Sequence, residues 1–453
     1  MRIPIGIVSC IIVSFCGMTS CSQRESPEAR PNIIFIMADD LGYGDLSSYG
    51  RTEYTTPHID GLIKGGIKFN QAYAAAPVCT PTRVALLTGK YPARNEIGLK
   101  EPLDEFEDKH LGLSSRIPTL SSMMKAAGYR TALFGKWDLG SIPEALPNAH
   151  GFDYFYGITG GAADYIDHQS INGLHQLYEN NRPIEEDGYL TDRIADHTIA
   201  YIEKNHDKPF FISLQFNAPH WPWQQPGDGP HPFDSTWQGF QKGGSPEVFA
   251  NMMRNLDWNV GRILKTLDTH GLFHNTIVIF TSDNGGETYS DMGNLRGQKL
   301  SLYEGGIKVP AGLRWPGVVS EGRVSEQPII TMDWTATILR IGQANIPEGL
   351  RLDGMDLTDH LKGNKEIKPR EFYWRYGLLN TEGEENAYRK GDWKYLSNSE
   401  GKFLFNLKED PSEKQDLKHL KRNKFDQLKT AFQALDKKML GRVTVNEKTT
   451  TRN

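Results

Sequence analysis

The sequence predicts an α/β fold in which helices sandwich a mostly parallel central sheet, with a smaller C-terminal antiparallel sheet plus helix. Four nearly continuous apolar runs, each ending in polar residues, support the first part of this prediction; they occupy 32–40, 129–138, 209–220 and 276–286. Runs so rich in Ile, Val and Phe are typical of strands that are buried on both faces, as in a parallel sheet.

Helix-like segments separate these runs and cover 118–129, 189–205 and 247–271. Strands and helices that alternate along a chain are typical of α/β folds with a mostly parallel sheet. In such folds the ligand binds beyond the carboxyl ends of the strands, so the polar residues that end each run are the first candidates for a functional site.

The pattern changes after about Gly363. Shorter alternating stretches such as "EFYWRYG" and "NAYRKGDWKYLS" predict the small antiparallel sheet, and "NKFDQLKTAFQALDKKML" predicts a polar helix after it. We therefore expect a main domain at 31–363, a small C-terminal α+β subdomain at 364–445 and a tail at 446–453.

The first 20 residues have the form of a signal peptide. An apolar run from Ile3 to about Gly17 is too short for a membrane span, and an N-terminal anchor helix is the alternative. The "MTSC" that ends at Cys21 resembles a bacterial lipobox, so we expect Cys21 to be lipidated and 21–30 to be a linker. The expected location is outside the cytoplasm, anchored by lipid in the periplasm or at the cell surface.

This export prediction isolates one cysteine. Of the 4 cysteines, Cys10 and Cys16 would leave with the signal peptide and Cys21 would carry lipid. Cys79 would then be the remaining thiol in an oxidising compartment and would have no partner for an internal disulfide.

The overall charge argues against a nucleic-acid partner. The chain has 51 Lys and Arg against 56 Asp and Glu, a net charge of -5. Nucleic-acid-binding proteins normally carry a basic excess.

Polar side chains end all four apolar runs, and one set of them is purely oxygen-bearing. Three carboxylates and an amide suit a hard cation such as Ca²⁺, with Mg²⁺ as the alternative, better than zinc, and the chain has no HExxH motif. Each segment by itself is also compatible with an ordinary Gly-rich turn. The candidate ligands are Asp39, Asp40, Asp283 and Asn284.

Cys79 stands at the expected start of a helix. Pro81 favours the first helical turn, and the helix would continue through "RVALLTG" to Gly89. An anionic nucleophile would be stabilised there by the positive field of the helix N-terminus, and Arg83 lies one turn further on. A buried cysteine that acts as a small hydrophobe is the alternative.

The stretch "CTPTRVALLTGKYPARN" resembles the signature of the type I, formylglycine-dependent sulfatases of the alkaline phosphatase superfamily, C-x-P-x-R followed by T-G-x-Y-P. Further segments in the same order strengthen this arylsulfatase-like resemblance: "PNIIFIMADDLGYGD", "GYRTALFGKWDLG", "FNAPHWPW", "TSDNGGE" and "LRGQKLSLYEGGIKVP". The resemblance implies an α/β sandwich with a smaller C-terminal domain.

The resemblance also implies a catalytic apparatus. A maturase would convert Cys79 to formylglycine (3-oxoalanine), whose hydrate is the nucleophile, and the metal ligands would be the four named above together with the Cys79-derived group. The other roles are a diol-holding residue, two sulfate-binding lysines and a histidine at the leaving oxygen, which correspond to Arg83, Lys136, Lys299 and His220.

One position departs from the family pattern. The family usually has G-K-W-H-L-G, and this chain has "GKWDLG", with Asp138 in place of His. Because a carboxylate repels sulfate, we expect Asp138 to be protonated, to turn toward Lys136 or Arg83, or to receive a substrate hydroxyl or amine.

The expected substrate is a sulfated carbohydrate. The loop at 218–240 is dense in Trp, Pro and His, and aromatic faces suit sugar rings. The alternatives are a phosphate or phosphonate ester hydrolase on the same fold, or a catalytically impaired lipoprotein that binds sulfated glycans. Further candidates for substrate contact are Asp164, His168, Trp374 and Arg375.

Overall fold

The structure is a computed structural model that describes Met1 and residues 30–104, 107–170, 172–231, 243–364, 368–377 and 383–441. The predicted signal peptide at 1–20, the lipidation site Cys21 and the tail at 446–453 therefore lie outside the described residues. Among the residues that are described, no helix is both long and apolar enough to cross a membrane.

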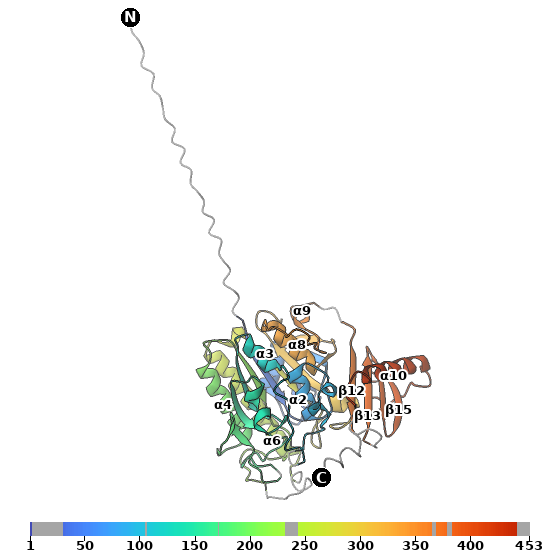
Figure 1. Cartoon of the computed structure of the whole chain (residues 1–453), viewed down its shortest axis with the longest axis horizontal. Coiled ribbons are helices and arrows are strands. Elements are labelled where there is room, and N and C mark those ends of the chain that lie inside the picture. The colour runs from blue at the N-terminus through green and yellow to red at the C-terminus, as the bar shows by residue number, and fades with distance from the viewer. Residues whose placement is uncertain are drawn as a thin grey trace.

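A large mixed sheet forms the centre of the molecule (Figure 1). Its strands lie in the order β10-β2-β9-β8-β1-β7-β3-β4-β5-β6, with β11 paired to β2. The pairs β1–β7, β1–β8, β3–β7 and β3–β4 are parallel, whereas β9 is antiparallel to both β8 and β2. The bounds are β1 Asn32–Ala38, β2 Ile67–Tyr73, β3 Arg130–Gly135, β4 Tyr154–Ile158, β5 Leu177–Glu179, β6 Arg182–Pro183, β7 Phe210–Gln215, β8 Thr276–Ser282, β9 Lys308–Arg314, β10 Arg323–Ser325 and β11 Ile329–Ile330.

The predicted α/β class is confirmed, because each of the four apolar runs contains a strand, β1, β3, β7 and β8. Helices cover both faces of the sheet, as the sandwich prediction requires. Their bounds are α1 Pro57–Lys64, α2 Cys79–Thr88, α3 Leu120–Ala126, α4 Leu190–Lys204, α6 Pro246–Thr269, α7 Glu304–Ile307, α8 Thr331–Ile341 and α9 Thr358–Leu361.

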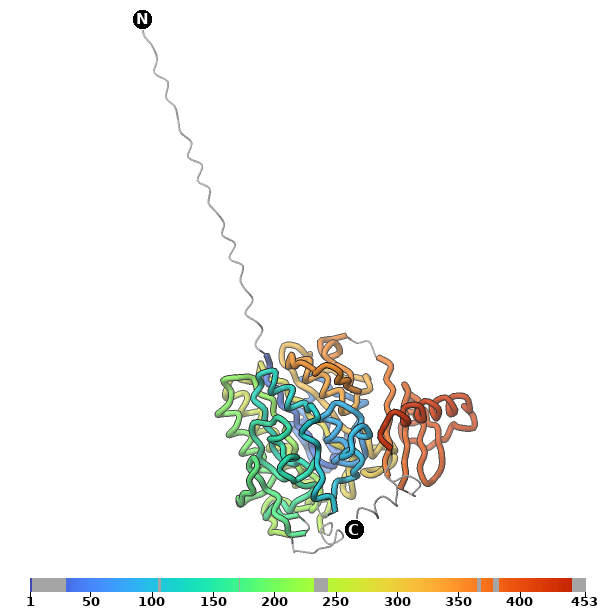
Figure 2. The backbone as a smooth tube through the Cα atoms, viewed as in Figure 1, coloured from blue at the N-terminus to red at the C-terminus, as the bar shows by residue number. Residues whose placement is uncertain are grey.

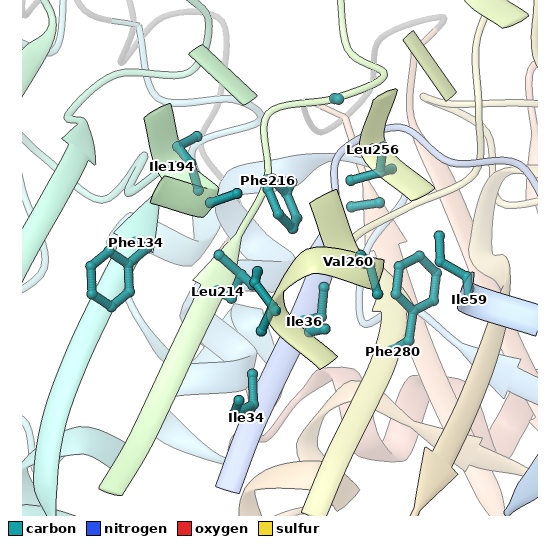
Figure 3. Close-up of a cluster of buried hydrophobic side chains, with 14 of the residues drawn as sticks. Ile34, Ile36, Ile59, Phe134, Ile194, Leu214, Phe216, Leu256, Val260 and Phe280 are labelled. Carbon is teal, nitrogen blue, oxygen red and sulfur yellow. The ribbon is translucent and has the colours of Figure 1, made fainter. Parts of the chain in front are cut away.

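Alternate residues of β1 contribute to two separate cores. Ile34 and Ile36 face α1, α4 and α6, where they pack with Phe280 and Val260 (Figure 3). Phe35 and its neighbours face α2, α3 and α8 on the other side. Because both faces of the strand are buried, the apolar run is continuous and ends only where the strand reaches the polar edge of the sheet.

The C-terminal part forms a second, antiparallel sheet beside the first unit (Figure 2). Its strands are β12 Glu371–Tyr376, β13 Glu385–Lys390, β14 Trp393–Asn398 and β15 Gly401–Asn406, and α10 Arg422–Asp436 packs against them. Successive side chains of β12 point to opposite faces of the small sheet. Trp374 packs on Tyr73 of the main sheet, with ring centroids 5.7 Å apart, and Tyr373 packs on Phe432 of α10, with ring centroids 5.2 Å apart. The predicted small sheet plus helix is confirmed.

Candidate active site

Two adjacent parallel strands deliver the predicted oxygen ligands to one place. Asp39 and Asp40 follow β1, and Asp283 and Asn284 follow its neighbour β8; all four side chains are buried. Asp40 has φ 62°, a left-handed conformation that turns the chain at the end of the strand, and its N–H donates to Asp283 Oδ1 at 3.1 Å. The structure therefore brings the four predicted ligands together.

Two oxygens of this group lack hydrogen-bond donors. Among the described residues, Asp39 Oδ1 and Asn284 Oδ1 are buried without a hydrogen-bond partner, although Arg83 Nη2 lies 3.5 Å from the former. Asn284 uses its amide nitrogen to donate to Asp40 Oδ1 at 2.7 Å and to the carbonyl of Gly285 at 2.9 Å. Buried oxygens are normally satisfied, so this donor set fits a hard cation.

His220 joins the same group. One ligand atom each from Asp39, Asp40 and His220 lie within 4.8 Å of one another, so these three residues would also be able to hold a metal ion. The sequence interpretation placed His220 only at the leaving oxygen. The loop after β7 brings the imidazole within 3.5 Å of Asp40 Oδ2.

Three buried cations balance the carboxylates. Lys136 Nζ lies 2.7 Å from Asp39 Oδ2, and Lys299 Nζ lies 2.7 Å from Asp40 Oδ2. Arg83 donates to Asp283 Oδ2 at 2.8 Å. Burial, with the neighbouring Asp39 carboxylate, raises the pKa of Asp283 to about 6 against the opposing effect of Arg83. A divalent cation at this position would favour the ionised carboxylates.

Cys79 is the first residue of α2 and is buried beside these charges. Burial, followed by the Asp138 carboxylate, raises the pKa of the thiol well above its usual value, although Lys136 and Lys299 oppose the shift. The unmodified thiol is therefore protonated at neutral pH. Since a thiol reacts as the thiolate, Cys79 in its unmodified form is poorly suited to act as the nucleophile.

Arg83 points toward the ends of the strands. It donates to the carbonyl of Lys136 at 3.1 Å and to Gln215 Oε1 at 3.2 Å in addition to Asp283. Gln215 was not predicted from the sequence. The only signal was its place as the last residue of β7, in a strand buried at every position.

Asp138 has a different partner from those expected. Thr80 Oγ1 donates to Asp138 Oδ2 at 2.8 Å, and Asp138 has φ 58°. This hydrogen bond does not go to Lys136 or Arg83, which pair with Asp39 and Asp283, but the Asp138 carboxylate still contributes to raising the pKa of both cations. Protonation of Asp138 and contact with a substrate hydroxyl or amine stay predictions. Thr80 is the residue after Cys79, so Asp138 is tied to the N-terminal turn of α2.

His220 is held between Lys299 and its own loop. Nδ1 lies 2.5 Å from the carbonyl of Trp221, and Nε2 lies 3.1 Å from Lys299 Nζ. Burial, with the positive charge of Lys299, lowers the pKa of His220 well below its usual value. The ring is therefore neutral, with Nδ1–H donating to the carbonyl and Nε2 accepting from Lys299.

Glu287 is a second residue that sequence reasoning missed. It lies at the end of "SDNGGE", where burial raises its pKa against the effect of Lys299, and the Asp40 carboxylate adds to the shift. Glu287 is therefore a further buried carboxylate beside the cluster.

Similarity to known proteins decides the family. Residues 31–344 match the family model described as sulfatase. The chain belongs to the sulfatase family. Residues 297–440 of this sulfatase also match the model described as N-sulphoglucosamine sulphohydrolase, C-terminal. It is a sulfuric ester hydrolase.

Individual relatives cover most of the sulfatase. Steryl-sulfatase from Rattus norvegicus is 31% identical over 79% of this chain and 74% of its own length. N-acetylgalactosamine-6-O-sulfatase from Bacteroides thetaiotaomicron is 30% identical over 88% of this chain and 92% of its own. The protein in the crystal structure of Ps i-CgsB in complex with k-i-k-neocarrahexaose is 29% identical in sequence to this chain, and the two folds match with a TM-score of 0.80. The match covers 93% of that chain and 90% of this one.

The four residues suggested for substrate contact make structural contacts in the sulfatase. Asp164 accepts from Gln224 and from the backbone of its own loop, and His168 Nε2 lies 3.0 Å from the carbonyl of Gly188. Trp374 donates to the carbonyl of Ala74 at 2.8 Å. Arg375 contacts Asp436 and the carbonyl of Leu440, on the α10 side of the small sheet. Their role in substrate binding stays a prediction.

Hydrogen bonds and ion pairs connect the segment that carries Lys299 to the small C-terminal sheet and the turn after it. The N–H of Leu302 donates to Glu385 at 2.5 Å, and that of Glu304 donates to Glu413 at 2.6 Å. Lys394 Nζ lies 2.9 Å from both Glu304 and Glu413. The C-terminal part therefore positions one wall of the candidate active site.

Proposed function

We propose that this sulfatase removes sulfate from a sulfated carbohydrate, with formylglycine derived from Cys79 and a bound divalent cation, Ca²⁺ or alternatively Mg²⁺. The observation that carries the proposal is the junction of α2 with the strand ends: Cys79 lies beside three cations and beside buried carboxylate and amide oxygens that lack donors. A sulfate ester needs such cations, because negative charge accumulates on its oxygens in the transition state.

Two groups would be acquired after synthesis. Asp39, Asp40, Asp283 and Asn284 would hold the cation, with His220 adjacent, and the cation would polarise sulfate oxygens as a Lewis acid. The formylglycine hydrate would supply the attacking hydroxyl, and its second hydroxyl would allow sulfate to be expelled. A formylglycine-generating maturase is therefore an expected partner.

The chain's own side chains would position and neutralise the substrate. Lys136 and Lys299 would bind the sulfate oxygens, and Arg83 would orient the residue-79 side chain from within the same helix. Lys299 and His220 lie 3.1 Å apart, so this pair would deliver the proton that the leaving oxygen requires. Neutral His220 accepts from Lys299 in the resting site, which gives the proton a short path.

The carbohydrate class rests on two kinds of support. The match covers 92% of the length of the N-acetylgalactosamine-6-O-sulfatase, a relative named for a sulfated sugar. It covers 74% of the length of the steryl-sulfatase. Trp221 also lies against His220, with ring centroids 4.4 Å apart, and would place an aromatic ring beside the leaving group. Export and an N-terminal lipid at Cys21 would place the enzyme where extracellular polysaccharides are met.

The test is a matched panel of sugar sulfates, steroid sulfates and the corresponding phosphate esters. The enzyme is produced with a maturase, and the mass of the peptide that contains residue 79 is measured in the same preparation. We expect conversion of Cys79 and the highest kcat/KM on a sugar sulfate, with activity lost on chelation. Faster phosphate hydrolysis would overturn the sulfatase mechanism. Conversion without any turnover would favour a glycan-binding role.

A further inference from the structure

A second basic site lies two strands away from the candidate active site. A cavity of about 670 Å³ opens between the main sheet and the small C-terminal sheet, with Tyr43, Tyr73, Lys308 and Arg389 in its wall. Tyr73 ends β2, and Lys308 begins β9, which is antiparallel to β2 and β8. The cavity is therefore at the same edge of the sheet as Asp39 and Asp283, displaced outward past β9.

Lys308 brings a cation into this cavity, and Glu304 and Glu326 are the carboxylates of the described lining that act on it. Its ammonium lies 4.8 Å from the centroid of the Tyr43 ring. The two carboxylates that act on it are engaged with other groups, since Glu304 pairs with Lys394 and Glu326 accepts from the amides of Asn70 and Gln71. Burial lowers the pKa of Lys308, as expected for a cation that lacks full compensation.

Arg389 provides a second buried cation, whose charge also acts on Glu304. The residue is 2% exposed, and its Nη1 is buried without a hydrogen-bond partner among the described residues. Its other nitrogens donate to neutral oxygens, Nε to the carbonyl of Gly391 at 2.8 Å and Nη2 to Gln71. The guanidinium stacks over Tyr73 at 4.9 Å. A buried N–H of this kind is suited to bind an anionic oxygen.

The rest of the lining is balanced in charge, so the excess positive charge of the cavity comes from Lys308 and Arg389. The other charged residues of the lining are Lys368, Arg370, Lys408, Glu304, Glu326 and Asp392. The cavity's volume is within the range that holds a small ligand or a short oligosaccharide segment. Positive charges that converge on a polar and aromatic cavity suit an anionic sugar residue, because the ring packs on the tyrosines while the anionic group pairs with the cations.

We propose that this cavity is an ancillary binding site for an anionic sugar residue, which Lys308 and Arg389 hold by its sulfate or carboxylate group. The proposal rests on the proposed function for its ligand class, a sulfated oligosaccharide. The site would bind a part of the polysaccharide other than the ester under hydrolysis. It would lower the KM for long anionic substrates and leave the chemical step unchanged.

The first test measures binding to the full chain in which Cys79 has not been converted, so that turnover cannot obscure it. Neocarrahexaose, with its sulfate groups, is titrated calorimetrically into wild type, Lys308→Met and Arg389→Met. We expect each substitution to weaken binding by about tenfold or more, because a buried charge pair is lost. Lys265→Met, an exposed lysine on α6, is the matched control and should bind as wild type does. Unchanged affinity in a folded Lys308→Met variant overturns the proposal.

The second test uses the matured enzyme and separates this site from the active site. Lys308→Met should raise the KM for the sulfated hexasaccharide and leave kcat, and all kinetic constants on a small aryl sulfate, unchanged. Equal losses on both substrates overturn the proposal, because they indicate a general structural effect. If the enzyme binds the hexasaccharide through Lys308 but does not desulfate any sugar, the proposed function fails while the cavity assignment stands.

Discussion

Two buried ionic clusters at opposite ends of one segment differ in whether each side-chain oxygen has a close partner in the protein. Around Lys394, the ammonium lies 2.9 Å from both Glu304 and Glu413, and Tyr73 also donates to Glu304. At the active site, Asp39 Oδ1 and Asn284 Oδ1 are buried and accept no hydrogen bond from the described residues. In the first cluster each carboxylate oxygen has a close partner in the protein, although among the described residues Glu413 Oε1 has only the ion contact with Lys394. In the second cluster two oxygens have no donor within the described part of the chain, as expected of a site that takes up a cation.

The two clusters are connected through the chain. Lys299 belongs to the active site, and Glu304, five residues later, belongs to the Lys394 cluster. Between them Leu300 donates to the carbonyl of Pro77, close to Cys79. The small C-terminal sheet therefore contributes to the candidate active site indirectly, because a structural ion cluster fixes the segment that carries Lys299.

The largest effect is expected from Cys79→Ala. This substitution removes the side chain proposed to become the nucleophile, so kcat should fall by at least about 10⁴-fold. The Lys394 cluster is not touched, and the free energy of unfolding should change far less than activity does. Steady-state kinetics and urea unfolding of the same preparation measure both. Residual activity within tenfold of wild type would show that residue 79 is not the nucleophile.

Lys394→Met should instead cause a large loss in the free energy of unfolding. Removal of one partner from a buried ion pair leaves Glu304 and Glu413 uncompensated, which typically costs about 3–5 kcal/mol. Because Glu304 fixes the Lys299 segment, we also expect kcat/KM to fall for all substrates, with the residue-79 modification intact. Urea unfolding measures the first effect, and Lys265→Met is the exposed control. Full stability with lost activity would contradict the structural assignment of this cluster.

The Lys394 cluster should also make stability depend on pH. Burial raises the pKa of Glu413 from 4.5 to about 7, with the Glu304 carboxylate adding to the shift and Lys394 opposing it. A raised pKa in the folded state means that the stabilisation is present below pH 4.5 and is lost as the pH rises through about 7.

Glu413→Gln removes this titration. Relative to the variant, wild type should lose at most about 3 kcal/mol of unfolding free energy between pH 5 and pH 8. Urea unfolding at the two pH values measures the difference. Parallel pH profiles for wild type and variant would show that Glu413 does not titrate in this window.

The sequence could predict those parts of the site that follow buried strands. Continuous apolar runs marked β1 and β8, and the carboxylates directly after them had to meet because neighbouring parallel strands end at the same edge. The cluster of Lys394, Glu304 and Glu413 was not predictable in this way. Its members come from three distant segments, and a single charged residue within a strand or turn carries no periodic signal of burial.

The fold shows the same division between local pattern and long-range contact. The strand and helix order predicted the α/β class, whereas β9 was missed because "KVPAGLR" contains Pro and Gly and has no continuous apolar run. Gln215 and Thr80 were missed for another reason. Both are ordinary residues in their own elements, and only the packing of α2 against β7 and the Asp138 turn gives them partners in the site.

The smallest expected effect on activity comes from substitution of Asp138. Asp138 adds a carboxylate where the family usually has His, and it accepts from Thr80 next to Cys79. Because a carboxylate close to the sulfate opposes binding, Asp138→His in the matured enzyme should raise kcat/KM, by at most about tenfold, since nearby cations screen the charge. Asp138→Asn keeps the size and the ability to accept from Thr80, so it isolates the effect of charge. If Asp138→His abolishes turnover while Asp138→Asn retains it, then Asp138 is no tolerated substitute for histidine and its bond to Thr80 is what the site requires.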